Sequence, residues 1–180
     1  MRRFAALWLA AVVVATISGC GYTTHSQINE RYKTIYIEPF VNKVDIAHET
    51  SSGNKYKLYR PSLETDVSQH VSNKFLFDGN LKPATKESAD LVLKGELVEL
   101  RRDPLRYDNS DNVTEYRLSI CVNIALWDKR ENKMLFEENN FVGYTTYFIS
   151  GSLAKTDDAA VNDALEDLSR RIVERVVEQW

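Results

Sequence analysis

The spacing of apolar residues predicts two amphipathic helices. In both stripes the apolar residues recur every three or four positions, which places them on one face of a helix. The first stripe is made of Leu63, Val67, Val71 and Phe75. The second stripe is made of Val161, Leu165, Leu168, Ile172 and Val176. Gly79 is expected to end the first helix, and Thr156 is suited to cap the start of the second, which we expect to run to Trp180.

Strict alternation between apolar and polar residues predicts a strand over residues 115–126. Its apolar face is made of Tyr116, Leu118, Ile120, Val122, Ile124 and Leu126. Cys121 falls on the opposite face, away from the helices. Either a partner protein covers this thiol, or neighbouring side chains of the sheet bury it. A polar turn at 128–132 leads into a strand over residues 133–148, so the two strands should form a hairpin.

Two further strands complete the expected fold. Residues 33–38 are β-branched and aromatic and end at Pro39. Residues 89–100 form a longer apolar strand, in which Gly95 marks a bulge or a close approach. The element order is therefore β-α-β-β-β-α. We expect an α+β fold, a two-layer α/β sandwich with two helices packed on one face of a four-stranded, mostly antiparallel sheet.

The first nineteen residues have the composition of a cleavable export signal. Two arginines precede an apolar stretch at 4–17, which is too short to span a bilayer comfortably. The stretch ends in the sequence Ile-Ser-Gly-Cys20, which resembles the lipobox of bacterial lipoprotein precursors. In those precursors the cysteine takes a diacylglyceryl group and becomes the mature N-terminus. We therefore expect a lipid on Cys20 that holds the protein on a membrane.

Composition limits what the mature chain can be. Removal of residues 1–19 leaves 161 residues, of which 20–32 read as lipidated N-terminus and tether and 33–180 as one domain. Loss of the two signal arginines leaves 21 basic against 26 acidic residues, and this net charge of −5 argues against nucleic acid as a partner. Since Cys121 then has no cysteine to pair with, the domain must be stable without an internal disulfide.

The sequence carries no pattern typical of catalysis. Its histidines, His25, His48 and His70, lack metal-ligand spacing, and there is no nucleophile elbow, phosphate loop or dinucleotide fingerprint. Glu137 and Glu138 are neighbours on a strand and point to opposite faces, which disqualifies them as an acid/base pair. We therefore expect neither an enzyme nor a protein with a cofactor or metal.

Several segments, taken in order, resemble the LPS-assembly lipoprotein LptE family of Gram-negative bacteria. They are Cys20-Gly21-Tyr22, Ile35-Tyr36-Ile37-Glu38-Pro39-Phe40-Val41-Asn42, Ala89-Asp90-Leu91-Val92-Leu93-Lys94-Gly95, Glu115-Tyr116-Arg117-Leu118 and the Ala-rich start of the last helix. Together they cover most of the mature chain, and the family is similar in fold to the sandwich expected above. The polar segment at 42–57 is longer than the corresponding link of the family.

The resemblance implies a non-enzymatic outer-membrane lipoprotein that faces the periplasm. It would plug the LptD β-barrel, help to assemble it, and assist the transport of lipopolysaccharide (LPS) to the outer leaflet. The alternative is a periplasm-facing lipoprotein that scaffolds or activates a cell-wall synthesis enzyme. The short tether at 20–32 favours the first function, because it keeps the domain at its own membrane.

One end of the expected sandwich is a candidate LPS-binding site. In a meander of the last three strands, the loop after residue 100 and the loop after residue 148 emerge at the same end. The basic residues expected there are Arg101, Arg102, Arg106 and Lys155. Guanidinium and ammonium groups form strong charge-assisted hydrogen bonds with phosphates such as those of lipid A. The resemblance adds that the family's LPS-binding residues lie in these loops: Lys155 matches one position well and Arg106 the other loosely. Acidic neighbours favour the alternative that these charges are merely solvated.

Overall fold

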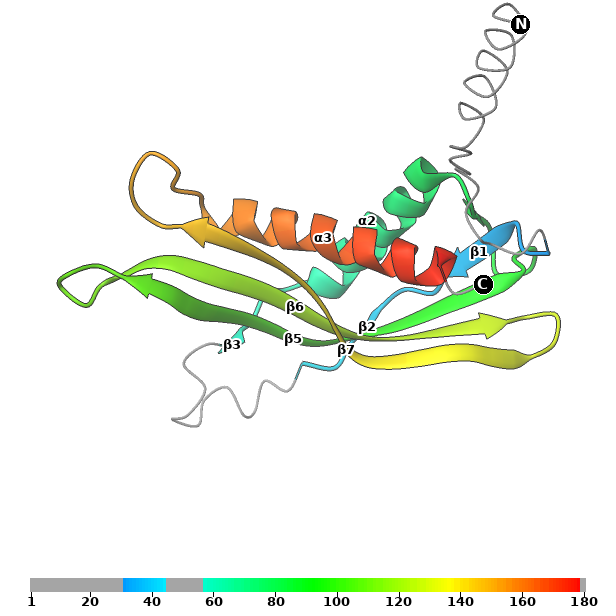
Figure 1. The fold of residues 1–180 in the computed structure, drawn as a ribbon. Coiled ribbons are helices and arrows are strands. Elements are labelled where there is room, and N and C mark those ends of the chain that lie inside the picture. Colours follow the sequence, from blue (N-terminus) through cyan, green and yellow to red (C-terminus); the bar gives the residue numbers. More distant parts are fainter. Residues whose placement is uncertain (1–30, 45–56, 179–180) are drawn as a thin grey trace, which may run out of the picture.

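The computed structural model describes residues 31–44 and 57–178 as a layer of two helices on a mixed sheet (Figure 1). The signal sequence, Cys20 and nearly all of the tether lie outside the described residues, as does 45–56, most of the polar segment. Within these limits the α+β fold and the two-layer arrangement predicted from the sequence are confirmed.

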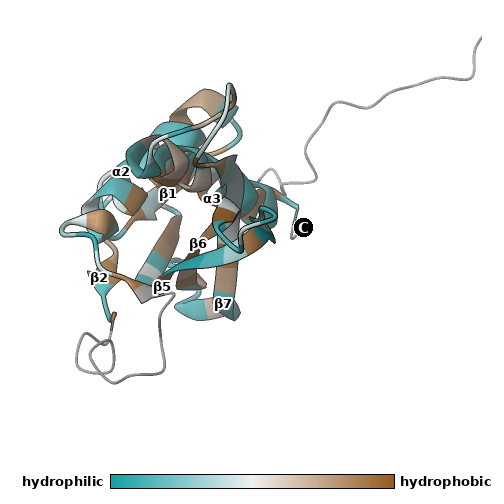
Figure 2. Ribbon diagram, turned by 90° about the vertical axis from the view of Figure 1, so that its left-hand side faces the viewer, coloured by the Kyte–Doolittle hydropathy of each residue, from teal (hydrophilic) through white to brown (hydrophobic). Residues whose placement is uncertain are grey.

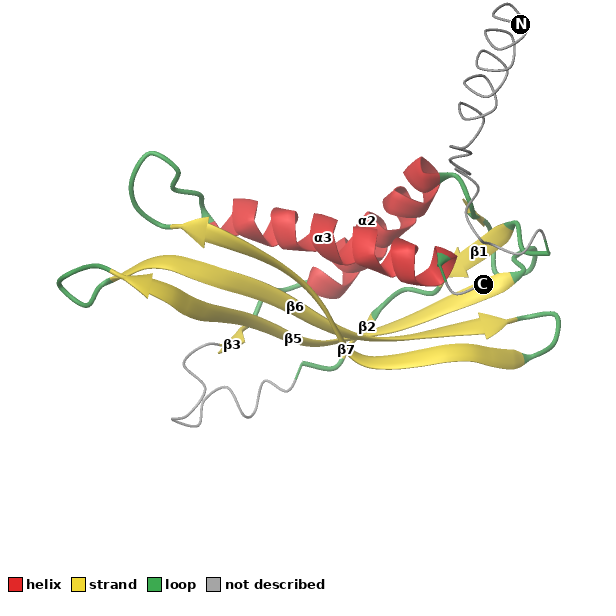
Figure 3. Cartoon of the chain, in the orientation of Figure 1, coloured by secondary structure: helices red, strands yellow, loops and turns green. Residues whose placement is uncertain are grey.

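Three long strands form the body of the sheet. They are β5 (Leu91–Tyr107), β6 (Val113–Asp128) and β7 (Lys133–Phe148), and each is antiparallel to the next. Strand β1 (Thr34–Ile37) lies parallel to β5 on its other side. The hairpin predicted between the last two strands is present, and Figure 3 shows how far the three strands extend.

The sheet has more strands than the four predicted. The short strand β4 (Lys82–Pro83) extends it beyond β1, so that the order is β4-β1-β5-β6-β7. Two other short strands, β2 (Val41–Asn42) and β3 (Lys57–Leu58), pair with β5 beyond the end of β1. The prediction missed these three because a strand of two residues has no measurable period.

Both helices pack on the same face of the sheet, as predicted. They are α2 (Leu63–Asp78) and α3 (Asp157–Val177), and the views in Figures 1 and 2 show them together on one side of the strands. All nine residues of the two predicted stripes are buried, as is the apolar face of β6 from Leu118 to Leu126. The Thr156 side chain accepts a hydrogen bond from the Ala159 backbone at 3.2 Å, which caps α3. Gly79 ends α2 with a positive φ of 77°.

Two glycines let the layers approach closely. A side chain at Gly95 would lie within 2.4 Å of the buried Phe40 ring, so this position is the close approach that the sequence suggested. The irregularities of β5 fall elsewhere, between Leu97 and Glu99 and on either side of Arg106. At Gly143, an added Cβ would lie 2.5 Å from the Leu168 Cα. Helix α3 can therefore lie directly on β7.

Strand β5 is longer than predicted, which corrects the position of three arginines. The prediction ended the strand at residue 100, but β5 continues to Tyr107 and the connection to β6 spans only 108–112. Pro104 is tolerated because the described residues place no strand on the outer edge of β5 at that point. The charged stretch stays extended in this region because it pairs with β6. The arginines at 101, 102 and 106 therefore lie in a strand and not in a loop.

Candidate functional site

The sheet separates the three predicted arginines onto two faces. Arg102 pairs with Leu118, whose side chain lies in the core, so Arg102 is on the helix face. Arg101 pairs with Ser119 and Arg106 with Glu115, and a register shift before Arg106 keeps both on the face without helices. The prediction that one loop cluster holds all of them is wrong, although they do share one end of the sandwich.

Arg102 is held at the junction between the sheet and α3. Its Nη1 donates to Asp157 Oδ2 at 2.6 Å, and its guanidinium lies 4.7 Å from the centre of the Tyr116 ring. The buried Tyr147 hydroxyl donates to the other oxygen of Asp157 at 2.7 Å. These contacts join β5 and β7 to the first turn of α3. Arg102 is therefore engaged in holding the fold together.

Arg106 and Lys155 flank one residue, Phe148, the last of β7. The Arg106 guanidinium lies 5.7 Å from the centre of the Phe148 ring, and the Lys155 backbone N–H donates to the Phe148 carbonyl at 2.9 Å. The carboxylate partners of these cations are exposed or loosely bound. Arg106 Nε is 3.5 Å from Glu115 Oε2, and Lys155 Nζ is 2.5 Å from Asp163 Oδ2. With 65% and 50% of their side chains exposed, both cations are available to an anion from solvent.

Exposed apolar residues lie in the same segments as this pair of cations. They belong to the end of β5 and to the connection from β7 to α3: Leu105, Tyr107, Ile149 and Leu153. Leu153 is 73% exposed. The arrangement therefore offers separated cations within an apolar surface, which suits a ligand that is both anionic and lipidic.

The open face of the sheet carries a second group of basic residues. Tyr144 on β7 lies between Arg117 of β6 and Arg171 of α3, whose guanidinium carbons are 5.4 and 5.8 Å from its ring centre. These three residues and Arg101 line a hollow of about 690 Å³. Among the described residues Arg117 has no carboxylate partner, whereas Arg101 pairs with Asp103 at 2.8 Å. Glu137 and Glu138 line the same hollow, and Glu138 pairs with Arg175, so the hollow has arginines on one side and carboxylates on the other.

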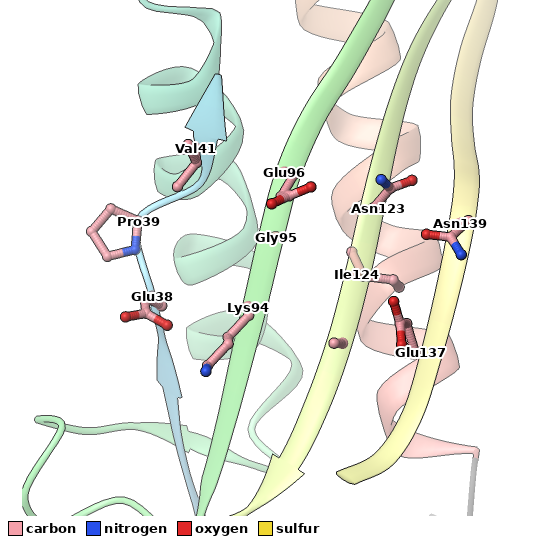
Figure 4. A pocket seen from close by; sticks show the side chains of 11 residues that line it. Glu38, Pro39, Val41, Lys94, Gly95, Glu96, Asn123, Ile124, Glu137 and Asn139 are labelled. Atoms are coloured by element: carbon pink, nitrogen blue, oxygen red, sulfur yellow. The ribbon is translucent and has the colours of Figure 1, made fainter. Parts of the chain in front are cut away.

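A second hollow on the open face, of about 470 Å³, is acidic. Figure 4 shows Glu38 before β2, Glu96 on β5 and Glu137 on β7 around it. Lys94 is the basic residue of its lining, and the remaining polar groups are amides. A phosphate would meet carboxylates here, so this hollow does not suit the anionic ligand considered above. Glu137 lines both hollows, so the open face is acidic near β2 and carries its arginines toward the connection between β5 and β6.

Cys121 lies on this open face, as its alternation with buried neighbours predicted. It is half-buried between Glu99 of β5 and Val142 of β7. Burial, followed by the negative charge of Glu99, raises the pKa of its thiol. Neighbours within the sheet therefore protect the cysteine in part, and they leave the rest of it accessible to a partner.

The aromatic residues that contact the arginines were not predicted from the sequence. Tyr144 and Phe148 occupy cross-strand positions opposite Ser119 and Glu115, and only the register between β6 and β7 brings them to the arginines. A register counted from the tight turn at 128–132 would not have identified them, because two irregularities in the pairing of β6 and β7 shift the register by two residues before it reaches this end. Of the three histidines, His70 lies on α2 and the other two lie outside the described residues.

Residues 31–44 and 57–178 hold no cluster of three or more His, Cys, Asp or Glu side chains that could bind a metal ion. No helix in the same part of the chain is both long and apolar enough to span a bilayer. The described residues thus define a domain of the two-layer α+β class with charged and aromatic surfaces.

The chain belongs to the LptE family. The family model, described as lipopolysaccharide-assembly, matches residues 32–179, which is nearly all of the domain. The family resemblance inferred from the sequence is thereby confirmed, and the chain is a lipoprotein-family member associated with LPS assembly. No curated protein matches the chain.

Solved structures from several bacteria superpose on this chain. A hypothetical protein from Chlamydia trachomatis superposes with a TM-score of 0.53 at 16% identity, over 81% of this chain and 95% of that one. A minor lipoprotein from Acinetobacter baumannii gives 0.48 at 14% identity, over 81% and 93% of the two chains. The rare lipoprotein B of Shewanella oneidensis gives 0.40 at 14% identity, over 81% and 92%. The match to the Chlamydia protein is a likeness of fold.

Proposed function

We propose that this protein is an outer-membrane lipoprotein, anchored by lipid on Cys20 and facing the periplasm, that plugs an LptD-like β-barrel. In this role it helps to assemble the barrel and assists the transport of LPS to the outer leaflet. The observation that carries the proposal is the family match over residues 32–179. The role requires recognition and no catalysis, so it needs neither a cofactor nor a metal.

The proposed LPS contact is the end of the domain at Arg106, Phe148 and Lys155. Lipid A combines phosphate groups with acyl chains, and this end combines two accessible cations with exposed apolar side chains. Phosphate forms charge-assisted hydrogen bonds that can replace exposed pairs with carboxylates. Arg101 adds positive potential from the open face, and Arg102 contributes mainly by fixing the start of α3.

Charge reversal tests this contact. The double variant Arg106→Glu and Lys155→Glu should weaken LPS binding at least roughly tenfold at low salt, where screening is weakest. A matched control reverses Lys43 and Lys133, which are exposed and form no ion pair within the described residues. The control should bind LPS as the parent protein does. Equal affinities for both double variants would refute the site.

The proposed barrel contact is the open face of the sheet. The acidic residues of this face lie near β2, and its arginines lie toward the connection between β5 and β6. A barrel wall with basic residues opposite the first group and acidic residues opposite the second would complement it. Cys121 lies near the middle of the face. Thiol labelling of Cys121 should be slower in the presence of the barrel protein than in its absence. An unchanged labelling rate in the assembled complex would contradict coverage of this face.

Purification from membranes separates the proposed function from the alternative one. Under our proposal, the tagged protein brings down a large β-barrel membrane protein. Co-isolation with a peptidoglycan synthase instead would support the scaffold of a cell-wall enzyme and reject the plug. Replacing Cys20 by Ala tests the anchor: an unprocessed precursor is expected, and normal maturation with membrane retention would exclude lipidation at this residue.

A further inference from the structure

The two most exposed apolar residues of α2 lie at its C-terminal end. Phe77 is 88% exposed and Leu76 is 63% exposed, although the helix buries the rest of its apolar stripe against the core. Neither side chain is needed to close the core, because Phe75 and Leu81 on either side of them are fully buried. Two adjacent apolar residues that are both exposed to water, one aromatic and one aliphatic, indicate a surface that an apolar partner or a membrane covers.

Two lysines stand beside this apolar pair. Lys82 follows the end of α2 by four residues and begins β4, and its backbone N–H donates to the Lys33 carbonyl at 2.9 Å. Both lysines are exposed, and neither forms an ion pair with a described residue. The nearest acid in sequence, Asp78, accepts hydrogen bonds from Asn80. The local surface thus combines apolar bulk with positive charge.

The same corner is where the chain arrives from the membrane anchor. Ten residues lie between Cys20 and Arg31, and the eleven residue steps from one to the other span at most about 40 Å when fully extended. The entry point is fixed to the domain, because the buried Tyr32 donates to Asp128 at 2.7 Å and the backbone N–H of Lys33 donates to Asp90 at 2.9 Å. The anchor at Cys20 therefore joins the domain at this corner, and its reach from the corner is limited to about 40 Å.

We propose that Leu76 and Phe77, with Lys33 and Lys82, form a membrane-docking corner that rests on the anionic surface of a phospholipid bilayer. This inference depends on the lipid anchor at Cys20 that the proposed function includes. Apolar side chains enter the boundary between headgroups and acyl chains, and lysines beside them bind anionic headgroups. Docking fixes the orientation of the domain at the end where the tether enters, which is opposite the end at Arg106 and Lys155.

The other end of the domain provides an internal control. Leu153 is 73% exposed, comparable with Leu76 and Phe77, and lies in the connection from β7 to α3. Tyr147 and Arg102 mark that end, whereas β1 and the turn at 128–132 mark the end where the tether enters (Figure 1). If exposed apolar residues contacted lipid without specificity, Phe77 and Leu153 would contact the bilayer equally. A docking corner predicts contact at Phe77 and not at Leu153.

The test uses the lipidated full-length protein in vesicles of phosphatidylethanolamine and phosphatidylglycerol. An environment-sensitive fluorophore is attached to the Phe77→Cys variant or, as control, to the Leu153→Cys variant, each in a Cys121→Ser background. Spin-labelled lipid should quench the fluorophore at position 77 several-fold more strongly than the one at 153. Adding Lys33→Glu and Lys82→Glu should reduce the quenching at 77.

Equal quenching at the two positions, or none at 77, would overturn the docking corner. Protection of position 77 only when the barrel protein is added would also overturn it, because a protein and not lipid would then cover the corner. The mass of the acyl group on Cys20 is measured on the same sample. An acylated protein without quenching at 77 refutes the docking corner alone, whereas absence of the acyl group refutes both the anchor and the corner.

Discussion

The Tyr147 hydroxyl donates a hydrogen bond of 2.7 Å to Asp157, and this bond joins the end of β7 to the first turn of α3. Asp157 also accepts a hydrogen bond from Arg102 on β5. One carboxylate therefore connects the helix with two strands that are not neighbours in the sheet. The carboxylate also lies at the helix N-terminus, where negative charge is favourable.

Replacing Tyr147 by Phe should lower the free energy of unfolding by about 0.5–1.5 kcal/mol at pH 7, because one buried hydrogen bond is lost while the ring is kept. Burial and the bond to Asp157 raise the pKa of Tyr147 to about 12. The bond therefore stabilises the fold fully below pH 10 and is lost as the pH rises through 12. Urea titrations of both proteins should converge over this range. A constant difference above pH 10 would contradict the assignment.

Asp128 is the fully buried carboxylate at the other end of the sheet. Burial opposes its charge, but hydrogen bonds from Tyr32 and from the backbone of Glu131 and Arg130 outweigh burial and hold the pKa below its ordinary value. The Asp128→Asn variant should lose about 1–3 kcal/mol at pH 7, since an amide has one accepting oxygen for these donors.

The same group makes stability sensitive to acid. Because the pKa of Asp128 is lowered on folding, its contribution is present above the ordinary aspartate value of about 4 and is lost as the pH falls through the folded value. Denaturant titrations at pH 7 and in acid should show that the advantage of the parent protein over Asp128→Asn shrinks. An advantage that persists unchanged in acid would exclude Asp128 as the responsible group.

Gly143 tests the contact between β7 and α3. In the Gly143→Ala variant the new methyl group would lie 2.5 Å from the Leu168 Cα, so truncation of the Leu168 side chain cannot relieve the clash. We expect a loss of roughly 1–3 kcal/mol in thermal or urea unfolding. The control Thr146→Ala changes an exposed residue of the same strand and should stay within about 0.5 kcal/mol of the parent. Similar losses for both variants would argue against the close contact.

Cys121 should react slowly with thiol reagents in the folded protein. Its pKa is raised by burial and then by Glu99, so less of the reactive thiolate is present at a given pH. The reaction rate measured against pH should rise at a higher pH than in the urea-unfolded chain. The Glu99→Gln variant should move that profile toward the unfolded one. Coincident profiles for folded and unfolded chains would show that the thiol is not protected.

Long periodic segments were predictable from the sequence because the apolar period repeats several times along each of them. Helices α2 and α3 and strand β6 all have apolar stripes of at least four residues, and burial of those stripes is what the structure confirms. Strand β5 was only partly predictable. Beyond Leu100 its side chains are charged and include Pro104, which is typical of a loop, and pairing with β6 overrides that local preference.

The candidate site was less predictable than the fold. Basic residues were recognised at Arg106 and Lys155, but their common neighbour Phe148 depends on strand register and on the path of the connection into α3. The division of Arg101 and Arg102 between two faces follows simple alternation along a strand. It was missed only because those residues were assigned to a loop.

The outer edge of β5 is completed by three separate short strands, β1, β2 and β3, all from the N-terminal part of the chain. These segments come first along the chain, and before β5 follows only β1 has a partner among the described residues, the two-residue strand β4. Pairing over such a distance along the chain is slow, because the entropy of closing the loop is lost before any contact is gained. Until that pairing occurs, β5 presents an open edge to other chains. The interval before β5 pairs with its N-terminal strands is thus the most aggregation-prone period in the folding of this domain.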